Sequence, residues 1–449
     1  MIKRSSVLAP LAGLAVAAFM LWPATGLAGP GDGLQAGNLV VHPRLSLTGE
    51  YDTNVFRRTT AETGVSELPS APILYIAPGL GIQTDDPQAL DLNFDGELVW
   101  EQFFGGDNAV DAQTGLTGNA YLGAELNPNG GFSFTVENDF THNSEEPTVS
   151  TANERNWLRN SVGGIIGIHP GDDILRIDLG YHWNINRYYF DTALDLDKQQ
   201  HVASFDMTWR FLPKTAFILE SDLEVNRYES PTRGAQGSGL PNTDSMPVNV
   251  KGGLSGLISR RLSTKLLFGW EWGIYESGPD YSEPIGRAQF GFKWGDLSLD
   301  SGIGVHYERS FDDSTLGNYY GSHEVGGEVQ QNFFDKAFGL RAGAKYILRD
   351  YADLDADRTG PTGPNTEPRY YIVSNASGND IRIPFGLNDN ILNINAAIMS
   401  DFADWGSLEL SYNFWGNFTD DQVRAPTENV TALREFQQHV VQLKATVKY

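Results

Sequence analysis

The sequence predicts an all-β fold: an antiparallel transmembrane β-barrel of about eighteen strands, with short periplasmic turns and long extracellular loops. Three observations predict it. Apolar and polar residues alternate with a period of two along most of the chain, tight and longer connections follow one another in turn, and the chain ends on a two-faced strand that finishes with Tyr449. Such a sheet has one face toward lipid, one toward water and no free edge.

Residues 1–28 have the three parts of a secretory signal peptide. The segment opens with two basic residues, continues with an apolar run that ends at Trp22, and closes with small residues up to Ala28. The run is too short, and too soon followed by a cleavage site, for a membrane-spanning helix. We therefore expect cleavage near Ala28 and an exported barrel domain of residues 29–449, with an uncleaved anchor as the alternative.

Composition removes several classes of function. The chain has no cysteine, which excludes thiol nucleophiles, zinc thiolates and haem attachment. A net charge of −25 argues against a nucleic-acid partner. No GxSxG, HExxH or phosphate-loop motif occurs, so we expect no enzyme and no cofactor. A hydrolase whose groups meet only in the folded chain is the alternative.

The alternation locates the strands. Along residues 90–100 the even positions are apolar or glycine, and all odd positions except Val99 are polar. Successive side chains of a strand point to opposite faces, so each such segment has one apolar and one polar face. The expected strand centres are Leu47, Tyr75, Phe94, Ala120, Val136, Val162, Leu179, Phe205, Leu219, Gly252, Phe268, Phe290, Ile303, Gly327, Ala342, Ile394, Leu410 and Leu443.

The connections between these strands are of two kinds that alternate. The tight ones lie near Asp85, Asn127, Pro170, Pro213, Arg260, Gly295, Asp335 and Asp401. The longer ones are clearest at 59–70, 142–155, 229–246, 312–316, 350–390 and 419–435. A soluble β-sandwich has no reason to segregate loop length in this way, whereas an outer-membrane barrel does, with both termini on the periplasmic side.

Closure of the barrel requires the first strand, 43–56, to pair with the last, 439–449. On the last strand Val441, Leu443, Ala445, Val447 and Tyr449 form the apolar face, and the residues between them are polar. A terminal aromatic on such a strand resembles the signal that the barrel assembly machinery reads. We therefore expect these five residues to contribute to closure and assembly.

Polar faces that point inward would line the lumen, which in a barrel of this size is wide enough for an aqueous channel. An acidic excess there would disfavour anions, although any wet lumen also collects charge for solvation and cross-strand pairing. An aromatic residue among them could stack on sugar rings. The expected lumen residues are Asp91, Asp95, Glu97, Glu137, Asp178, Glu220, Asp222, Arg176, Arg210 and Tyr121.

The long connection 350–390 opens with aspartates at alternate positions from Asp353. This spacing resembles a calcium loop, but the glycine is at Gly360 and the twelfth position is Pro364, where a bidentate glutamate is required. We therefore predict a solvated acidic loop and no metal site. An alternative is that the loop folds inward and forms a constriction.

The stretch GEYDTNVFR, residues 49–57, resembles the start of the β-barrel porin-2 family. The resemblance implies an outer-membrane pore for export of polysaccharide, either exopolysaccharide or capsule, with separate export proteins as partners. Two alternatives remain: a general or sugar-specific diffusion porin, and a non-conducting structural or motility barrel of the envelope. Outer-membrane lipid, lipopolysaccharide and the barrel assembly machinery are the other expected partners.

Removal of residues 447–449 is expected to abolish assembly into the outer membrane, because it deletes the end of the closing strand. Membrane fractionation, together with the gel migration of unheated and heated samples, measures it. A truncated chain that still assembles would show that the terminus is only a frayed tail.

Overall fold

The computed structural model describes residues 32–57, 69–106, 108–143, 157–170, 174–188, 197–229, 232–233, 240–241, 243–314, 318–352, 370–374, 380–384, 388–419, 422–424, 431–433 and 436–449. The predicted signal peptide and the acidic loop from Asp353 lie outside these residues. No helix among them is long and apolar enough to span a membrane.

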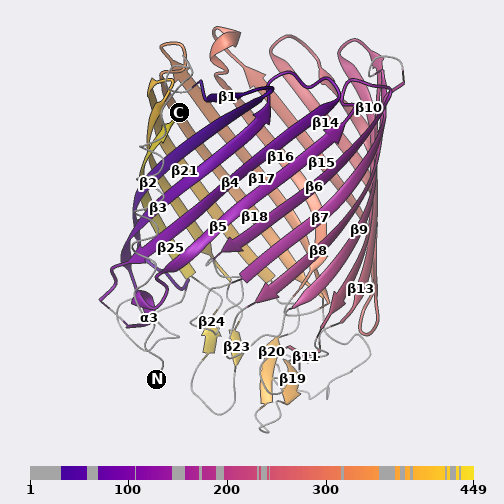
Figure 1. The fold of residues 1–449 in the computed structure, drawn as a ribbon. Helices are drawn as coiled ribbons and strands as arrows, with labels where there is room; N and C mark the ends of the chain where they lie inside the picture. Colours follow the sequence, from indigo (N-terminus) through magenta and orange to yellow (C-terminus); the bar gives the residue numbers. More distant parts are fainter. Residues whose placement is uncertain are drawn as a thin grey trace.

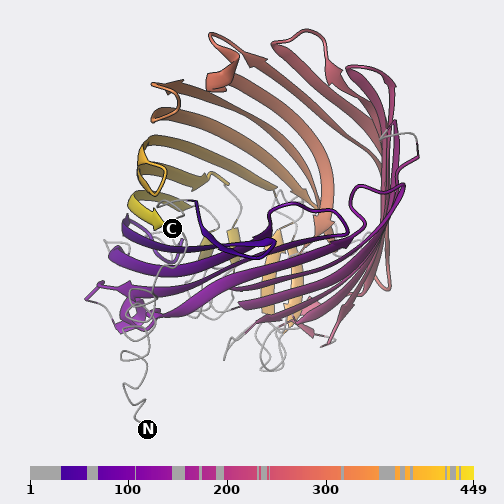
Figure 2. The same cartoon turned by 45° about the horizontal axis from the view of Figure 1, so that its top comes forward.

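A closed antiparallel barrel of eighteen strands forms the body of the protein, with one short additional strand, β1 (Leu34–Ala36), paired to its first strand (Figures 1 and 2). The predicted strand centres all fall within barrel strands, so the fold prediction is confirmed. The barrel strands are β2 (Leu39–Asp52), β3 (Ala71–Thr84), β4 (Leu90–Phe103), β5 (Gly115–Leu126), β6 (Phe132–Asn143), β7 (Trp157–Ile168), β8 (Leu175–Tyr188), β9 (Lys198–Leu212), β10 (Thr215–Tyr228), β13 (Ser245–Leu257), β14 (Leu262–Tyr275), β15 (Tyr281–Lys293), β16 (Gly302–Asp313), β17 (Tyr319–Phe333), β18 (Phe338–Tyr351), β21 (Asn388–Ala403), β22 (Gly406–Asn417) and β25 (Phe436–Lys448).

The barrel closes where β2 pairs with β25, which lie side by side in Figure 1. Their register runs from Arg44 opposite Lys448 to Asp52 opposite Val440. Beyond it, the Tyr449 backbone N–H donates to the Pro43 carbonyl over 3.0 Å. The predicted pairing of the first and last strands is thus present, and the sheet has no free edge within its wall.

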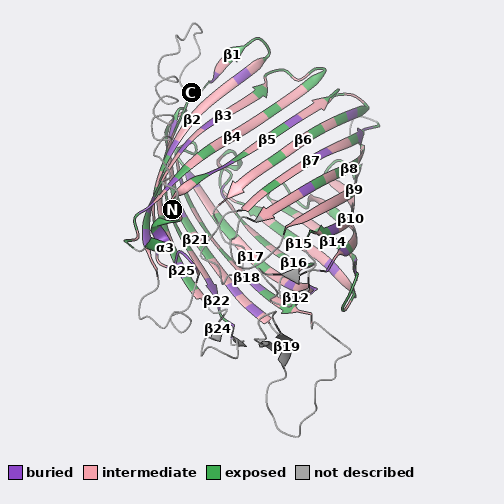
Figure 3. Cartoon of the chain, turned by 60° about the horizontal axis from the view of Figure 1, so that its bottom comes forward, coloured by how far each residue is buried: buried purple, intermediate pink, exposed green. Residues whose placement is uncertain are grey.

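The outer face is apolar and ends toward the long connections in a belt of aromatic residues (Figure 3 shows the alternating exposure). Three tyrosines of this belt hydrogen-bond to a histidine on the next strand, always two residues before the directly opposed position. The pairs are Tyr181 with His201 (2.7 Å), Tyr307 with His323 (2.9 Å) and Tyr412 with His439 (2.9 Å). Such amphipathic rings suit a membrane–water boundary.

The connections alternate as expected, with two corrections. The tight turn near Asp401 comes later, because β21 runs on to Ala403 through a register shift. Two connections at the long-loop end, 276–280 and 314–318, are as short as turns. At that same end the small strands β19 (Tyr370–Ser374), β20 (Asp380–Pro384), β23 (Gln422–Arg424) and β24 (Thr431–Leu433) form a separate sheet beyond the barrel (Figure 1).

The end of the GEYDTNVF stretch is not strand, although the sequence predicts strand through residue 56. After Asp52 the chain turns, and Val55 and Phe56 become almost fully buried against Ile73, Phe103 and Val110 of the short helix α3 (Asn108–Asp111). We call this group the Phe56 cluster. It forms because burial of the apolar side chains of Val55 and Phe56 away from water stabilises the folded chain.

Polar contacts fasten the same turn to the last strand. The Asn54 side-chain amide donates to the Gln437 carbonyl over 2.9 Å, and the Gln438 amide donates to the Asp52 carboxylate over 2.7 Å. The Arg57 guanidinium lies 5.3 Å from the centre of the Trp415 ring. The motif thus reinforces the closing seam at its loop end.

Asn54→Ala is expected to lower the free energy of unfolding by about 1–3 kcal/mol, because it removes a buried hydrogen bond between the two ends of the barrel. Urea unfolding in lipid vesicles, followed by tryptophan fluorescence, measures the loss. Asn129→Ala, which removes an amide bonded to Pro87 in an exposed turn, serves as the control. Equal effects of the two substitutions would contradict the role given to the seam.

Candidate functional site: the channel interior

The inner face of the barrel can be followed from strand to strand, because directly opposed residues of antiparallel strands share a face. One such row joins Asp95, Tyr121, Asp139, Ser161 and Asn184. It continues through Gln200, Asn226 and Ser245 to Tyr275. This row is polar throughout, whereas the alternate residues beside it on β4 and β5, such as Phe94 and Leu122, are apolar.

The predicted residues Asp95 and Glu97 on β4 share a basic partner from β2. Arg44 forms a bidentate ion pair with Asp95, in which one nitrogen–oxygen distance is 2.7 Å, and lies 3.6 Å from Glu97. The pair crosses β3, where a Cβ atom added to Gly79 would lie 2.6 Å from the Arg44 side chain. A glycine on the intervening strand thus permits side chains two strands apart to meet.

The same device brings together Tyr121, Glu137 and His182. The His182 Nε2 atom lies 2.6 Å from Glu137 across β7, and a Cβ atom on Gly163 would lie 2.0 Å from the imidazole ring. The Tyr121 hydroxyl donates to the other oxygen of Glu137 over 3.4 Å. Two of the predicted lumen residues are therefore bonded to each other, and Glu137 also contacts a histidine that the predicted set does not contain.

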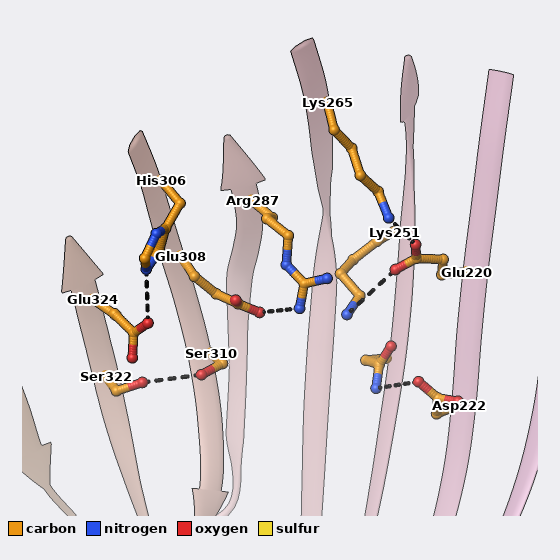
Figure 4. A network of polar contacts seen from close by, with 11 residues as sticks. Glu220, Asp222, Lys251, Lys265, Arg287, His306, Glu308, Ser310, Ser322 and Glu324 are labelled. Carbon is orange, nitrogen blue, oxygen red and sulfur yellow. Dashed lines mark hydrogen bonds and ion pairs between the residues drawn. The ribbon is translucent and has the colours of Figure 1, made fainter. Parts of the chain in front are cut away.

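A row of acids follows on the next strands. Asp178 opposes Asp206, which opposes Glu220, which opposes Lys251. Lys265 reaches Glu220 over 2.8 Å (Figure 4). Arg176 bonds to Asp178 over 2.7 Å, and Asp222 accepts from Asn249 over 3.3 Å.

Two predicted residues, Asp91 and Arg210, lie at the short-turn end of the wall. Asp91 opposes Glu125, another acid, and the backbone N–H of Arg210 bonds to the Ile174 carbonyl. All ten predicted residues therefore belong to one face of the sheet, but their ion pairs make four separate groups. They are centred on Asp95, Glu137, Asp178 and Glu220.

The opposite wall is more balanced in charge. Arg287 bonds to Glu308 over 2.6 Å, and His306 bonds to Glu324 over 2.9 Å (Figure 4). Lys345 lies 3.3 Å from the other oxygen of Glu324. Beside these pairs, toward the short turns, is a hollow of about 800 Å³ floored by glycines and lined by amide, hydroxyl and lysine side chains.

Acidic groups predominate on the inner face of β4–β10. In the part of these strands that the structure describes, the inward cations are Arg159, Arg176, Lys198 and Arg210. The inward carboxylates are Asp91, Asp95, Glu97, Glu101, Glu125, Glu137, Asp139, Asp178, Asp206, Glu220, Asp222 and Glu224. Several of these carboxylates have cationic partners, and a negative surplus remains.

Sequence reasoning missed a set of groups that no local spacing relates: Lys198, Ser245, Tyr275 and Asp313. They lie on four different strands, and Asp313 falls within the connection that the sequence predicts at 312–316. Alternation along β16 gives no signal for Asp313, because it places Asp312 and not Asp313 on the inner face. No group of three metal-binding side chains occurs among the described residues.

At the short turns, Asp300 accepts from Lys293 over 2.7 Å and also pairs with Lys336 of the next turn. The Lys293 and Lys336 ammonium groups lower the pKa of Asp300 to about 2. The carboxylate therefore remains ionised at neutral and mildly acidic pH, and it joins two neighbouring turns.

No family model and no curated protein matches the chain. Solved structures match it. OccK11 (OpdR) of Pseudomonas aeruginosa has 10% sequence identity to this chain and a TM-score of 0.43, and the match covers 91% of this chain and 96% of OccK11. OccAB4 of Acinetobacter baumannii has 12% identity, a TM-score of 0.45 and coverage of 94% and 100%. The outer membrane protein OpdK of Pseudomonas aeruginosa has 10% identity, a TM-score of 0.44 and coverage of 91% and 99%.

At these identities and TM-scores, the likeness carries no argument about what this chain does. The porin-2 resemblance also stays a prediction, because no family model supports it. The interior of the barrel therefore has to be interpreted from its own residues.

Gly163→Ala is expected to lower the free energy of unfolding by about 1–3 kcal/mol, because the new methyl group displaces His182 from Glu137. Urea unfolding in lipid vesicles measures it. Gly304→Ala, on the inner face of β16, is the matched control, because nothing lies within 4 Å of its added Cβ atom. If both substitutions are neutral, the contact across Gly163 contributes nothing to stability.

Proposed function

We propose that the chain is an outer-membrane diffusion channel for small polar solutes, which passes cations and neutral molecules in preference to anions. The single observation that carries this proposal is the polar inner face of a closed eighteen-strand wall, with a surplus of carboxylates on β4–β10. A barrel of this size is wide enough to hold water, and fixed charges along its wall bias which ions enter.

Export of polysaccharide, which the porin-2 resemblance implies, rests on that resemblance alone. The channel proposal needs only the charges and the closed wall, so it has the better support. The non-conducting envelope barrel has no specific contact in its favour among the described residues.

In planar lipid bilayers, insertion of the purified protein is expected to raise the conductance in steps. In a KCl gradient, the reversal potential should have the sign that indicates a preference for K⁺ over Cl⁻. The preference should weaken at high salt, because the screening length falls to about 3 Å at 1 M. Asp178→Asn combined with Asp206→Asn should reduce it, since both side chains belong to the acidic row on the inner face. Absence of any conductance step would eliminate the channel.

Asp335→Asn, in the turn between β17 and β18, is the control and should leave the reversal potential unchanged. A shift as large as that of the double substitution would show that the net charge of the protein, and not the charge of the lumen, sets the preference.

A further inference from the structure

The loop ends of β9–β16 converge on one carboxylate. Asp313, at the end of β16, accepts from the Ser245 hydroxyl over 3.0 Å and from the Tyr275 hydroxyl over 3.1 Å. Its other oxygen lies 3.8 Å from the Lys198 ammonium group. These three partners come from β13, β14 and β9, and we call the four residues the Asp313 cluster.

The contact between Lys198 and Asp313 is informative because of the number of strands between them. In the sheet order β9, β10, β13, β14, β15, β16 they are five steps apart, which is roughly 24 Å along the wall at the usual strand spacing. Their charged groups nevertheless touch. The end of β16 must therefore leave the wall and lie over the inner face of β9–β14, where Asp313 meets Lys198.

A break in the wall permits this displacement of β16. The pairing of β15 with β16 stops at Gly286 opposite Arg309, although β15 begins at Tyr281 and β16 continues to Asp313. The outer neighbours remain paired to those ends, since Tyr281 opposes Gly273 on β14 and Asp313 opposes Tyr319 on β17. The end of β16 is thus free of β15 and follows β17.

Aromatic side chains fill the space that the break leaves. Tyr275, Tyr281, Ile285 and Phe311 are buried together, and Tyr319 packs against them. The Tyr281 and Phe311 rings are stacked with their centres 4.7 Å apart. The inward position of β16 is therefore held by packing as well as by the polar contacts of Asp313.

The opposite side of the mouth is also filled. There the Phe56 cluster lies at the loop ends of β2–β4, and Arg57 extends over Trp415 of β22. The contacts of Asp313 with Lys198, Ser245 and Tyr275 bring the end of β16 over the inner face of β9–β14 and narrow the lumen at this level.

We propose that the Asp313 cluster forms the outer constriction of the channel and sets the size of the solutes that pass. This inference deepens the proposed channel function and rests on it. The constriction is built from the barrel wall, and its residues are specificity-determining: Lys198 and Asp313 hold two parts of the rim together, so their separation widens the passage.

The test uses Lys198→Cys combined with Asp313→Cys, in a chain that otherwise has no cysteine. A short, reducible bis-methanethiosulfonate reagent should link the two cysteines within one chain, seen as a gel shift that reductant reverses. Without the link, the two parts of the rim are free to separate. Single-channel conductance should then rise roughly 1.5-fold above wild type, because the lumen between them is wider. Linking should return it to the wild-type value.

Thr48→Cys with Ser161→Cys is the matched control, because these inner-face positions are also five strands apart, on β2 and β7. This pair should not be linked. Asp313→Asn, which keeps the size of the side chain and removes its charge, provides a conservative second variant, and its conductance should also rise.

Failure of Lys198→Cys and Asp313→Cys to be linked in a folded barrel would overturn the convergence of the rim. Linking without any change in conductance would overturn the constriction. A wild-type barrel that never conducts would instead overturn the proposed function, and with it the role of the cluster in permeation, whatever the cross-linking result.

Discussion

A sheet that crosses hydrocarbon must leave no backbone N–H or C=O group unpaired, and the rest of this structure depends on meeting that constraint. The pairing of β2 with β25 meets it by joining residues some four hundred positions apart in the chain. Contacts beyond strand pairing reinforce this seam. The turn at Asn54 and the burial of Phe56 supply them.

Closure also divides the side chains between an outer and an inner face. The inner face carries many charged groups, which need partners or water. Glycines such as Gly79 and Gly163 leave room for side chains from the flanking strands to meet over them. Arg44 thereby neutralises Asp95, and His182 contacts Glu137. Since pairing is incomplete on β4–β10, the lumen keeps a negative surplus, which is a property of the whole field and not of one residue.

Much of the fold could be predicted, because a period of two is a local property that the backbone imposes on every strand. Errors occur where tertiary contacts override that local signal. Residues 53–56 continue the pattern of the first strand but turn inward, because burial of Phe56 outweighs continued pairing. Ala403 extends β21 through a shift in register that alternation cannot show. The same holds for the candidate site. The face on which Asp178 lies was predictable from alternation, but its position opposite Asp206 was not.

The sequence by itself determined the class of fold, the order of strands, the alternation of turns and loops, and the face on which residues such as Asp95 and Glu220 lie. These follow from spacing along the chain, which is all that periodicity measures. Only the tertiary structure decided which of these residues meet. Lys198 and Asp313 meet because the end of β16 separates from β15 and lies over the inner face of the wall, and that position depends on contacts between residues far apart in the chain.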